Sequence, residues 1–175
     1  MAEAGARDRL QPSLLDRLLD NEPQSQREGI DARMLSRQQL RAAVLRDLSW
    51  LFNTTRAEPE VNSERETERA LWAQHDEARR SVLNYGMPAF SGATLSTLDT
   101  VAMEQSVKAA IEYFEPRIDA STLEVEVNID AYHHHNTLQL VIRGQMWNQP
   151  VPLELLLSAH VDLETGATRV HDMRA

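Results

Sequence analysis

Cysteine is absent from this 175-residue sequence, and lysine occurs once, at Lys108. The lack of cysteine excludes disulfide bonds and thiolate metal sites, and it is typical of a reducing compartment. No segment approaches the roughly 18 consecutive apolar residues that a helix needs to cross a bilayer, so no membrane insertion is expected. The opening residues MAEAGARDRLQPS contain no apolar run, so no secretory signal is expected there and the predicted location is the cytoplasm.

Positive charge is also scarce. The chain carries 18 basic and 27 acidic residues, for a net charge of −9, and its arginines are interleaved with acids. Because binding to nucleic acid depends on clustered lysine and arginine, no nucleic-acid partner is expected. The sequence has no glycine-rich phosphate loop and no nucleophile elbow, and no cofactor is predicted. Its length and its 42% of apolar residues fit one domain with an appendage.

The N-terminal region contains one short apolar stripe. Leu14, Leu15 and Leu18 follow helical spacing, and Pro12 and Ser13 form a suitable helix start. A helix of this length is not stable alone, so it must pack on its own domain or on the helices of a partner.

A polar linker, residues 20–33, follows this helix. The linker contains Pro23 and Gly29, which interrupt regular structure. The predicted organisation is therefore an N-terminal extension over residues 1–33 and a single domain over residues 34–175.

Three further helices are predicted from apolar periodicity and end signals. One begins at Ser36, which forms a capping-box pattern with Gln39, and ends near residues 53–55. A charged helix is expected from about residue 64 to 84, after a second capping pattern, Ser63 with Glu66, and Gly86 can close it in a left-handed conformation. The third keeps a period of 3.6 through Leu95, Leu98, Ala102, Met103, Val107, Ala110, Ile111 and Phe114.

After Pro116 the periodicity changes to two. Three amphipathic strands are predicted, with a short fourth strand after the turn at residues 164–166. Short connections between such strands indicate an antiparallel meander whose apolar face is covered by helices. The predicted fold class is α+β, with N-terminal helices packed on one face of a C-terminal three- to four-stranded antiparallel meander. The apolar strand residues are Leu123, Val125, Val127, Ile129, Leu138, Leu140, Ile142, Leu153, Leu155, Leu157, Ala159 and Val161.

The triplet His133, His134 and His135 lies between two predicted strands. A metal site needs several imidazoles that converge on one point, whereas adjacent strand residues point to opposite faces. At most two of the three histidines share a side, so we predict a polar hairpin tip and no metal site.

Paired carboxylates are the signature of glycoside hydrolysis, and Glu112, Glu115 and Asp119 lie near one another in sequence. A chain with 27 acidic residues offers such pairs by number alone. A sugar cleft also needs exposed aromatic residues, and Trp147 is the best candidate. We predict that the protein is not an enzyme.

The segment Glu115-Pro116-Arg117 marks a corner between the last helix and the first strand. Proline disfavours helix for the residue before it, so Glu115 should be extended. In an extended segment residues i and i+2 point the same way, which places Glu115 and Arg117 side by side. Two interpretations follow: the pair faces a partner, or it forms an internal salt bridge that holds the corner together.

Three segments together resemble the TssE family of type VI secretion baseplate subunits, which is similar to a small wedge protein of contractile phage baseplates. The segments are residues 10–18 (LQPSLLDRL), 81–88 (SVLNYGMP) and 114–117 (FEPR). Their order and spacing match the family over roughly residues 10 to 170.

The resemblance implies a structural role in the baseplate. Its expected partners are the wedge subunits TssF, TssG and TssK and the sheath proteins TssB and TssC. It also implies that Glu115, Pro116 and Arg117 are a family signature with a sheath-side function. We hypothesise that sheath strands add to an edge of the sheet, and that Leu14, Leu15 and Leu18 pack with wedge subunits. The alternative is a peptidoglycan-hydrolysing, lysozyme-like enzyme, for which no catalytic residue can be identified.

Overall fold

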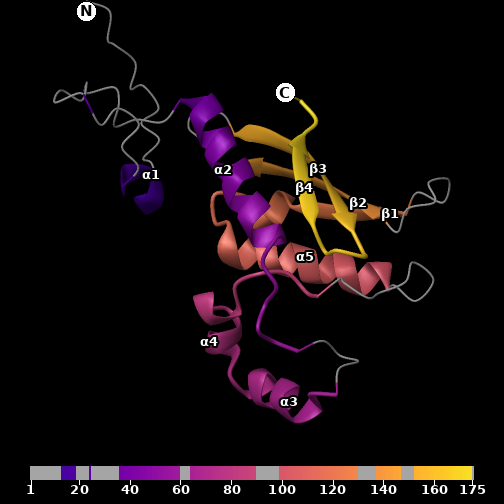
Figure 1. Cartoon of the computed structure of the whole chain (residues 1–175). Coiled ribbons are helices and arrows are strands. Elements are labelled where there is room, and N and C mark those ends of the chain that lie inside the picture. Colours follow the sequence, from indigo (N-terminus) through magenta and orange to yellow (C-terminus); the bar gives the residue numbers. More distant parts are fainter. Residues whose placement is uncertain are drawn as a thin grey trace, which may run out of the picture.

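Helices come first along the chain and a four-stranded antiparallel sheet comes last, which confirms the predicted α+β class. Figure 1 shows α2 (Arg37–Phe52) and α5 (Thr100–Phe114) with the sheet to one side of them. No helix within the described ranges is long and apolar enough to span a membrane. The structure is a computed structural model that describes residues 13–18, 24, 36–59, 64–89, 99–129, 137–146 and 152–174.

The sheet is a meander in which every pair of sequential strands is hydrogen-bonded and antiparallel. Most apolar residues of one parity, such as Leu140 and Leu157, are buried, as their alternation predicted, whereas Val125 and Val127 are half-buried and Ile129 is exposed. Gly166, with a φ of 75°, allows the tight turn before the last strand. The strands are β1 (Glu124–Ile129), β2 (Thr137–Met146), β3 (Leu153–Asp162) and β4 (Thr168–Asp172).

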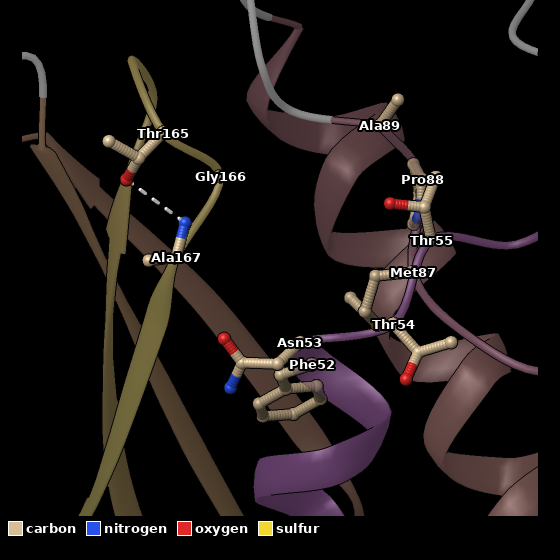
Figure 2. A pocket seen from close by; sticks show the side chains of 10 residues that line it. All are labelled: Phe52, Asn53, Thr54, Thr55, Met87, Pro88, Ala89, Thr165, Gly166 and Ala167. Carbon is tan, nitrogen blue, oxygen red and sulfur yellow. Dashed lines mark hydrogen bonds between the residues drawn. The ribbon is translucent and has the colours of Figure 1, made fainter.

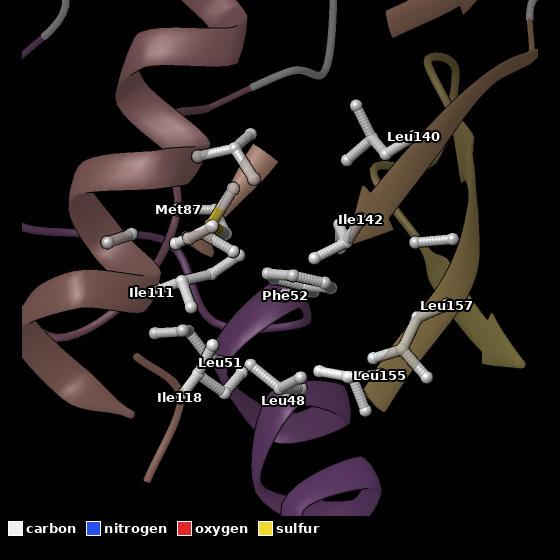
Figure 3. Close-up of a cluster of buried hydrophobic side chains, with 14 of the residues drawn as sticks. Leu48, Leu51, Phe52, Met87, Ile111, Ile118, Leu140, Ile142, Leu155 and Leu157 are labelled. Atoms are coloured by element: carbon white, nitrogen blue, oxygen red, sulfur yellow. The ribbon is translucent and has the colours of Figure 1, made fainter. Parts of the chain in front are cut away.

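The core lies between the two long helices and the inner face of the sheet. In Figure 3, Phe52 at the end of α2 lies between Ile111 of α5 and Ile142 of β2. Full burial of each large aliphatic side chain contributes about 1.5–3 kcal/mol, so this layer accounts for most of the stability. The buried residues of α2 are Leu40, Ala43, Val44, Leu48, Leu51 and Phe52.

Capping side chains fix where the long helices begin. The predicted capping box of α2 is present: Ser36 Oγ accepts the Gln39 N–H at 3.2 Å, and Gln39 Oε1 accepts the Ser36 N–H at 2.8 Å. In α5, the Asp99 carboxylate accepts the Ala102 N–H at 3.0 Å. The predicted earlier residues of this helix, Leu95 and Leu98, lie outside the described residues.

The N-terminal leucine helix is α1 (Leu14–Leu18). Ser13 and Asp16 form its start, because the Asp16 N–H donates to Ser13 Oγ at 3.2 Å and the Ser13 hydroxyl donates to Asp16 Oδ2 at 2.6 Å. Of the predicted linker only Gln24 is described, so the proposed boundary between extension and domain stays a prediction.

The single charged helix expected over residues 64–84 is wrong. The backbone leaves the helical conformation at His75, with φ −122° and ψ 72°, and no residue from 66 to 79 is buried. Without an apolar face to pack on, nothing holds the segment in one continuous helix. Ser63 of the predicted cap lies outside the described residues. The observed elements are α3 (Glu66–Gln74), α4 (Asp76–Arg79) and the 3-10 turn η2 (Val82–Asn84).

A buried asparagine closes the base of this charged segment. Asn84 Oδ1 accepts the Glu58 N–H at 2.9 Å, and its amide group donates to Glu58 Oε2 and to the Arg79 carbonyl, both at 3.2 Å. Arg79 Nε also donates to Glu58 Oε1 at 3.1 Å. These bonds hold Glu58, which precedes the charged segment, to Arg79 and Asn84 at its end. The segment is therefore closed, although α3 and α4 contain no buried residue.

Gly86 lies where two backbone segments meet. The Met87 N–H donates to the Thr54 carbonyl at 2.7 Å, and the Arg56 N–H donates to the Met87 carbonyl at 2.9 Å. Gly86 has a φ of +129°, and a Cβ there would lie 2.5 Å from the Thr54 oxygen. The positive φ agrees with the prediction that this position requires glycine. The close contact with the Thr54 backbone is a second reason why no side chain fits.

We expect Gly86→Ala to lower the free energy of unfolding by about 2 kcal/mol or more, because both the conformation and the contact exclude a side chain. Urea denaturation measures this loss. Gly144→Ala is the control, since the nearest neighbour of its Cβ would be the Ile118 side chain at 3.3 Å, with Leu123 at ordinary contact distance. Equal losses in both variants would contradict the explanation.

Candidate functional site

The corner after α5 holds a carboxylate and a guanidinium side by side, as the sequence predicted. α5 ends at Phe114, and Glu115 has left the helix before Pro116, although its φ of −128° and ψ of 71° are not those of the predicted extended chain. Arg117 Nε donates to Glu115 Oε1 at 2.6 Å, and Arg117 Nη2 contacts Glu115 Oε2. The pairing is therefore bidentate, which is the strongest geometry for these two groups.

Burial is unequal across this pair. Glu115 is only 2% exposed, whereas the Arg117 side chain is 24% exposed. The internal salt bridge, one of the two interpretations open from the sequence, is thus formed. In this conformation the Glu115 carboxylate does not itself face a partner, and only Pro116 and part of Arg117 reach the surface.

Asp47 on α2 completes the site. Arg117 Nη2 donates to Asp47 Oδ2 at 2.5 Å, and Arg46 Nε donates to Asp47 Oδ1 at 2.9 Å. One carboxylate therefore bridges two guanidinium groups. Neither Asp47 nor Arg46 was predicted from the sequence; the available signal was that Asp47 is the only acidic residue of α2.

The same network reaches α1. Arg46 Nη1 donates to Asp16 Oδ1 at 2.8 Å, and its guanidinium lies 5.2 Å from the Trp50 ring centre. α1 thus contacts α2 through its polar side. Leu14 and Leu18 point away from the domain, each 74% exposed.

We call the five charged residues Asp16, Arg46, Asp47, Arg117 and Glu115 the relay. It joins α1, α2 and the corner, which are distant in sequence, in one continuous line of ion pairs. The two groups of residues predicted to bind partners therefore belong to one connected region of the molecule.

The relay raises the pKa of Arg117. Burial lowers the pKa of Arg117, but hydrogen bonds and charge from Glu115 and then Asp47 outweigh it, and the net pKa is raised. Burial raises the pKa of the nearby Tyr85 hydroxyl, and the charges of Asp47 and Glu115 raise it further. These groups therefore keep their ordinary charge states at neutral pH.

The other carboxylates considered for catalysis do not form a site. Asp119 accepts hydrogen bonds from the N–H and hydroxyl of Ser121, and Glu112 is exposed on α5. Neither lines the two cavities described below. Within the described residues no group of three or more metal-ligating side chains converges, and His133, His134, His135 and Trp147 lie outside them.

Two cavities are present in the described part of the chain. The smaller, of about 190 Å³, lies between the end of α2, residues 87–89 and the turn at residues 165–167, and no charged side chain lines it (Figure 2). The larger, of about 570 Å³, is a groove between α3 and α5. Its walls mix alanines with residues that are already ion-paired, such as Glu58 and Arg79.

Interlocked ion pairs and exposed leucines characterise this region of the molecule. The chain matches the family model of the baseplate wedge protein gp25 over residues 38–151, which is more than half of its length. It belongs to this family of baseplate structural proteins, and its role is accordingly structural, in contact with other baseplate proteins. No curated protein and no solved structure matches it.

Removal of one partner from the corner should destabilise the fold unequally. Arg117→Ala leaves the buried Glu115 carboxylate without its guanidinium and is expected to cost about 3–5 kcal/mol. Glu115→Ala should cost less, about 2 kcal/mol, because Arg117 keeps Asp47 and some contact with water. Chemical denaturation measures both values.

An exposed ion pair provides the control for this comparison. Arg143 and Glu126 are bonded at 2.8 Å but are about half exposed. Arg143→Ala should therefore cost under about 1 kcal/mol. A smaller loss for Arg117→Ala than for Glu115→Ala would show that the buried carboxylate does not depend on this partner.

The contact between α1 and α2 should weaken in acid. Burial raises the pKa of Asp16, but hydrogen bonds from Ser13 and Arg46 outweigh it, so the folded pKa lies below the ordinary value of 3.8. Because the pKa of Asp16 is lower in the folded state, its ionised carboxylate stabilises the contact at every pH above the unfolded pKa. This stabilisation is lost as the pH falls through the folded pKa.

Hydrogen exchange of the α1 amides measures this effect. Asp16→Asn should exchange faster than the wild type at about pH 7, and the two proteins should converge as the pH falls through the folded pKa of Asp16. Asp119→Asn, at the start of the 3-10 turn η3 (Ala120–Thr122), should leave α1 unchanged. Equal exchange of wild type and Asp16→Asn at neutral pH would exclude the ion pair as the link.

Proposed function

We propose that this protein is a structural subunit of a type VI secretion baseplate, similar to TssE, and that it links the wedge to the contractile sheath and templates sheath assembly in the cytoplasm. Its partners are the wedge subunits TssF, TssG and TssK and the sheath proteins TssB and TssC. The family match supports the baseplate role. The observation that carries the linking role is the relay, because it fixes two contact surfaces in one rigid arrangement.

The wedge side of this proposal rests on α1. Leu14 and Leu18 lie one helical turn apart and are strongly exposed, while Leu15 is 38% exposed. Such an i, i+4 pair fits an apolar groove between helices of a partner. Because Asp16 fixes the opposite side of α1 to α2, the leucines are already oriented when the partner arrives.

The sheath side rests on the corner. Arg117 and the exposed Pro116 form its accessible part, and a guanidinium donates hydrogen bonds to a carboxylate or carbonyl, such as one on a sheath subunit. Glu115 and Asp47 act indirectly, since they hold Arg117 in one orientation. Glu115 is thus a positioning residue in the proposed interface.

Sheath strands would add to the sheet itself. A sheet edge offers unpaired N–H and C=O groups, and a strand that pairs with it continues the backbone hydrogen bonding. The corner lies directly before β1, so a docked Arg117 would set the position of the added strand.

Co-purification from cells that express the wedge and sheath subunits tests the function. We expect the full chain to bring down both sets. Leu14→Glu with Leu18→Glu should weaken wedge binding about a hundredfold or more, because two buried apolar anchors are lost. Leu71→Glu, at an exposed leucine of α3, is the matched control and should bind normally.

The outcomes separate the proposal from its alternatives. Capture of neither wedge nor sheath subunits would overturn the linking function. Clearing of a peptidoglycan gel by the purified chain would favour the hydrolase instead, and we expect none. Loss of wedge binding in the Leu71 variant alone would move the wedge surface from α1 to α3.

A further inference from the structure

The hydrogen-bond pattern of the sheet shows which backbone groups point outward at each edge. In an antiparallel pair, residues alternate between bonding the neighbouring strand and pointing away from it. The Val127 N–H donates to a side chain outside the sheet, so Val125, Val127 and Ile129 are the outward-pointing residues of β1. At the other edge, the Met173 N–H bonds the Leu156 carbonyl, which leaves Thr168, Val170 and Asp172 pointing outward from β4.

One carboxylate covers the β1 edge. Glu104, which is half-buried on α5, accepts the Val127 N–H at 2.9 Å. Among the described residues, no hydrogen bond joins the outward groups of Val125 or Ile129 to another residue, and Ile129 is 39% exposed. Within the described part of the chain, the β1 edge is therefore unpaired except at Val127, whose N–H is bonded to a side chain that can rotate away.

The β4 edge is fixed more firmly. The Asn53 amide accepts the Thr168 N–H at 3.0 Å and donates to the Thr168 carbonyl at 2.8 Å, as a neighbouring strand would. At the other end of β4, Arg41 Nη1 is bonded to Asp172 Oδ2 at 2.8 Å. α2 is thus held along β4 at both ends, as the adjacent ribbons in Figure 1 illustrate.

We propose that β1 is the edge that accepts an added strand and that Glu104 is its displaceable cap; this rests on the proposed function, in which a sheath strand joins the sheet. The Glu104 carboxylate accepts the hydrogen bond of the Val127 N–H, to which an incoming strand would also need to bond. The carboxylate and the strand therefore compete for this N–H. While no strand is present, the cap satisfies that N–H and discourages pairing between copies of the chain.

The side chains of β1 specify the chemistry of the added strand. Val125 and Val127 pack against the core, so the strand needs apolar residues on that face. On the opposite face β1 carries the exposed Glu124 and Glu126, of which Glu126 also pairs with Arg143 of β2. Cross-strand pairs of opposite charge are favourable, so the partner is an extended segment that alternates apolar with basic residues.

The test measures affinity of the full chain for the TssB–TssC sheath complex. Glu104→Ala opens the edge and should bind roughly tenfold more tightly, and Glu104→Gln, which keeps a weaker acceptor, should fall between it and the wild type. Glu112→Ala removes the same charge from an exposed position on the same helix and should bind as the wild type does. Asn53→Ala, which opens β4, should give no gain.

A second measurement needs no partner. Exchange of the Val127 amide in the isolated chain should be roughly tenfold faster in Glu104→Ala than in Glu112→Ala, because the N–H loses its acceptor. Equal exchange rates would overturn the cap.

The binding outcomes distinguish the inference from the function on which it rests. Tighter binding by Asn53→Ala, or equal binding by all variants, would overturn the choice of β1 while the linking function stands. No binding by any variant, with normal capture of wedge subunits, would overturn both the sheath link and the added strand.

Discussion

The structure depends on a guanidinium held between two carboxylates that come from different parts of the chain. Glu115 is almost fully buried, and a buried carboxylate is tolerated only where a charged partner satisfies it. Arg117 provides that partner and is itself held by Asp47 on α2. The junction of the helical layer with the sheet is therefore fixed by charge as well as by apolar packing.

Proline makes this arrangement possible. Pro116 ends α5 and forces Glu115 out of the helix. The side chain of Arg117, which follows the proline, then lies against the Glu115 carboxylate. The backbone then reaches Ile118, which pairs with Met146, and β1 follows. A helix that ran on would bury neither Glu115 nor the start of the sheet. The Glu115-Pro116-Arg117 segment therefore has a role in the fold itself. A partner that binds there would meet side chains that folding has already oriented.

Local signals in the sequence predicted much of this fold. The sequence did not predict ion pairs between residues that are far apart along the chain. The Ser36 capping box, the stop at Pro116 and the alternation in the strands depend on neighbours within a few residues, so they are visible in the sequence. The Asp47–Arg117 ion pair joins residues 70 apart, and only the packing of α2 against the corner brings them together. The charged segment failed for a related reason: its helical pattern was local, but no tertiary surface supports a continuous helix at His75.

A subunit that offers contact surfaces must also remain monodisperse before its partners arrive. Exposed leucines and open strand edges are the features that cause unwanted association, and native proteins restrict them with charged side chains. Here the same elements that position the surfaces also restrict them: Asp16 keeps α1 on the domain, Asn53 closes one edge of the sheet and Glu104 covers the centre of the other. Each restraint is a polar contact that a partner can replace at little net cost, because it exchanges one hydrogen bond for another. Under the proposed function the β1 edge would open first, because one carboxylate holds it whereas a paired amide holds β4.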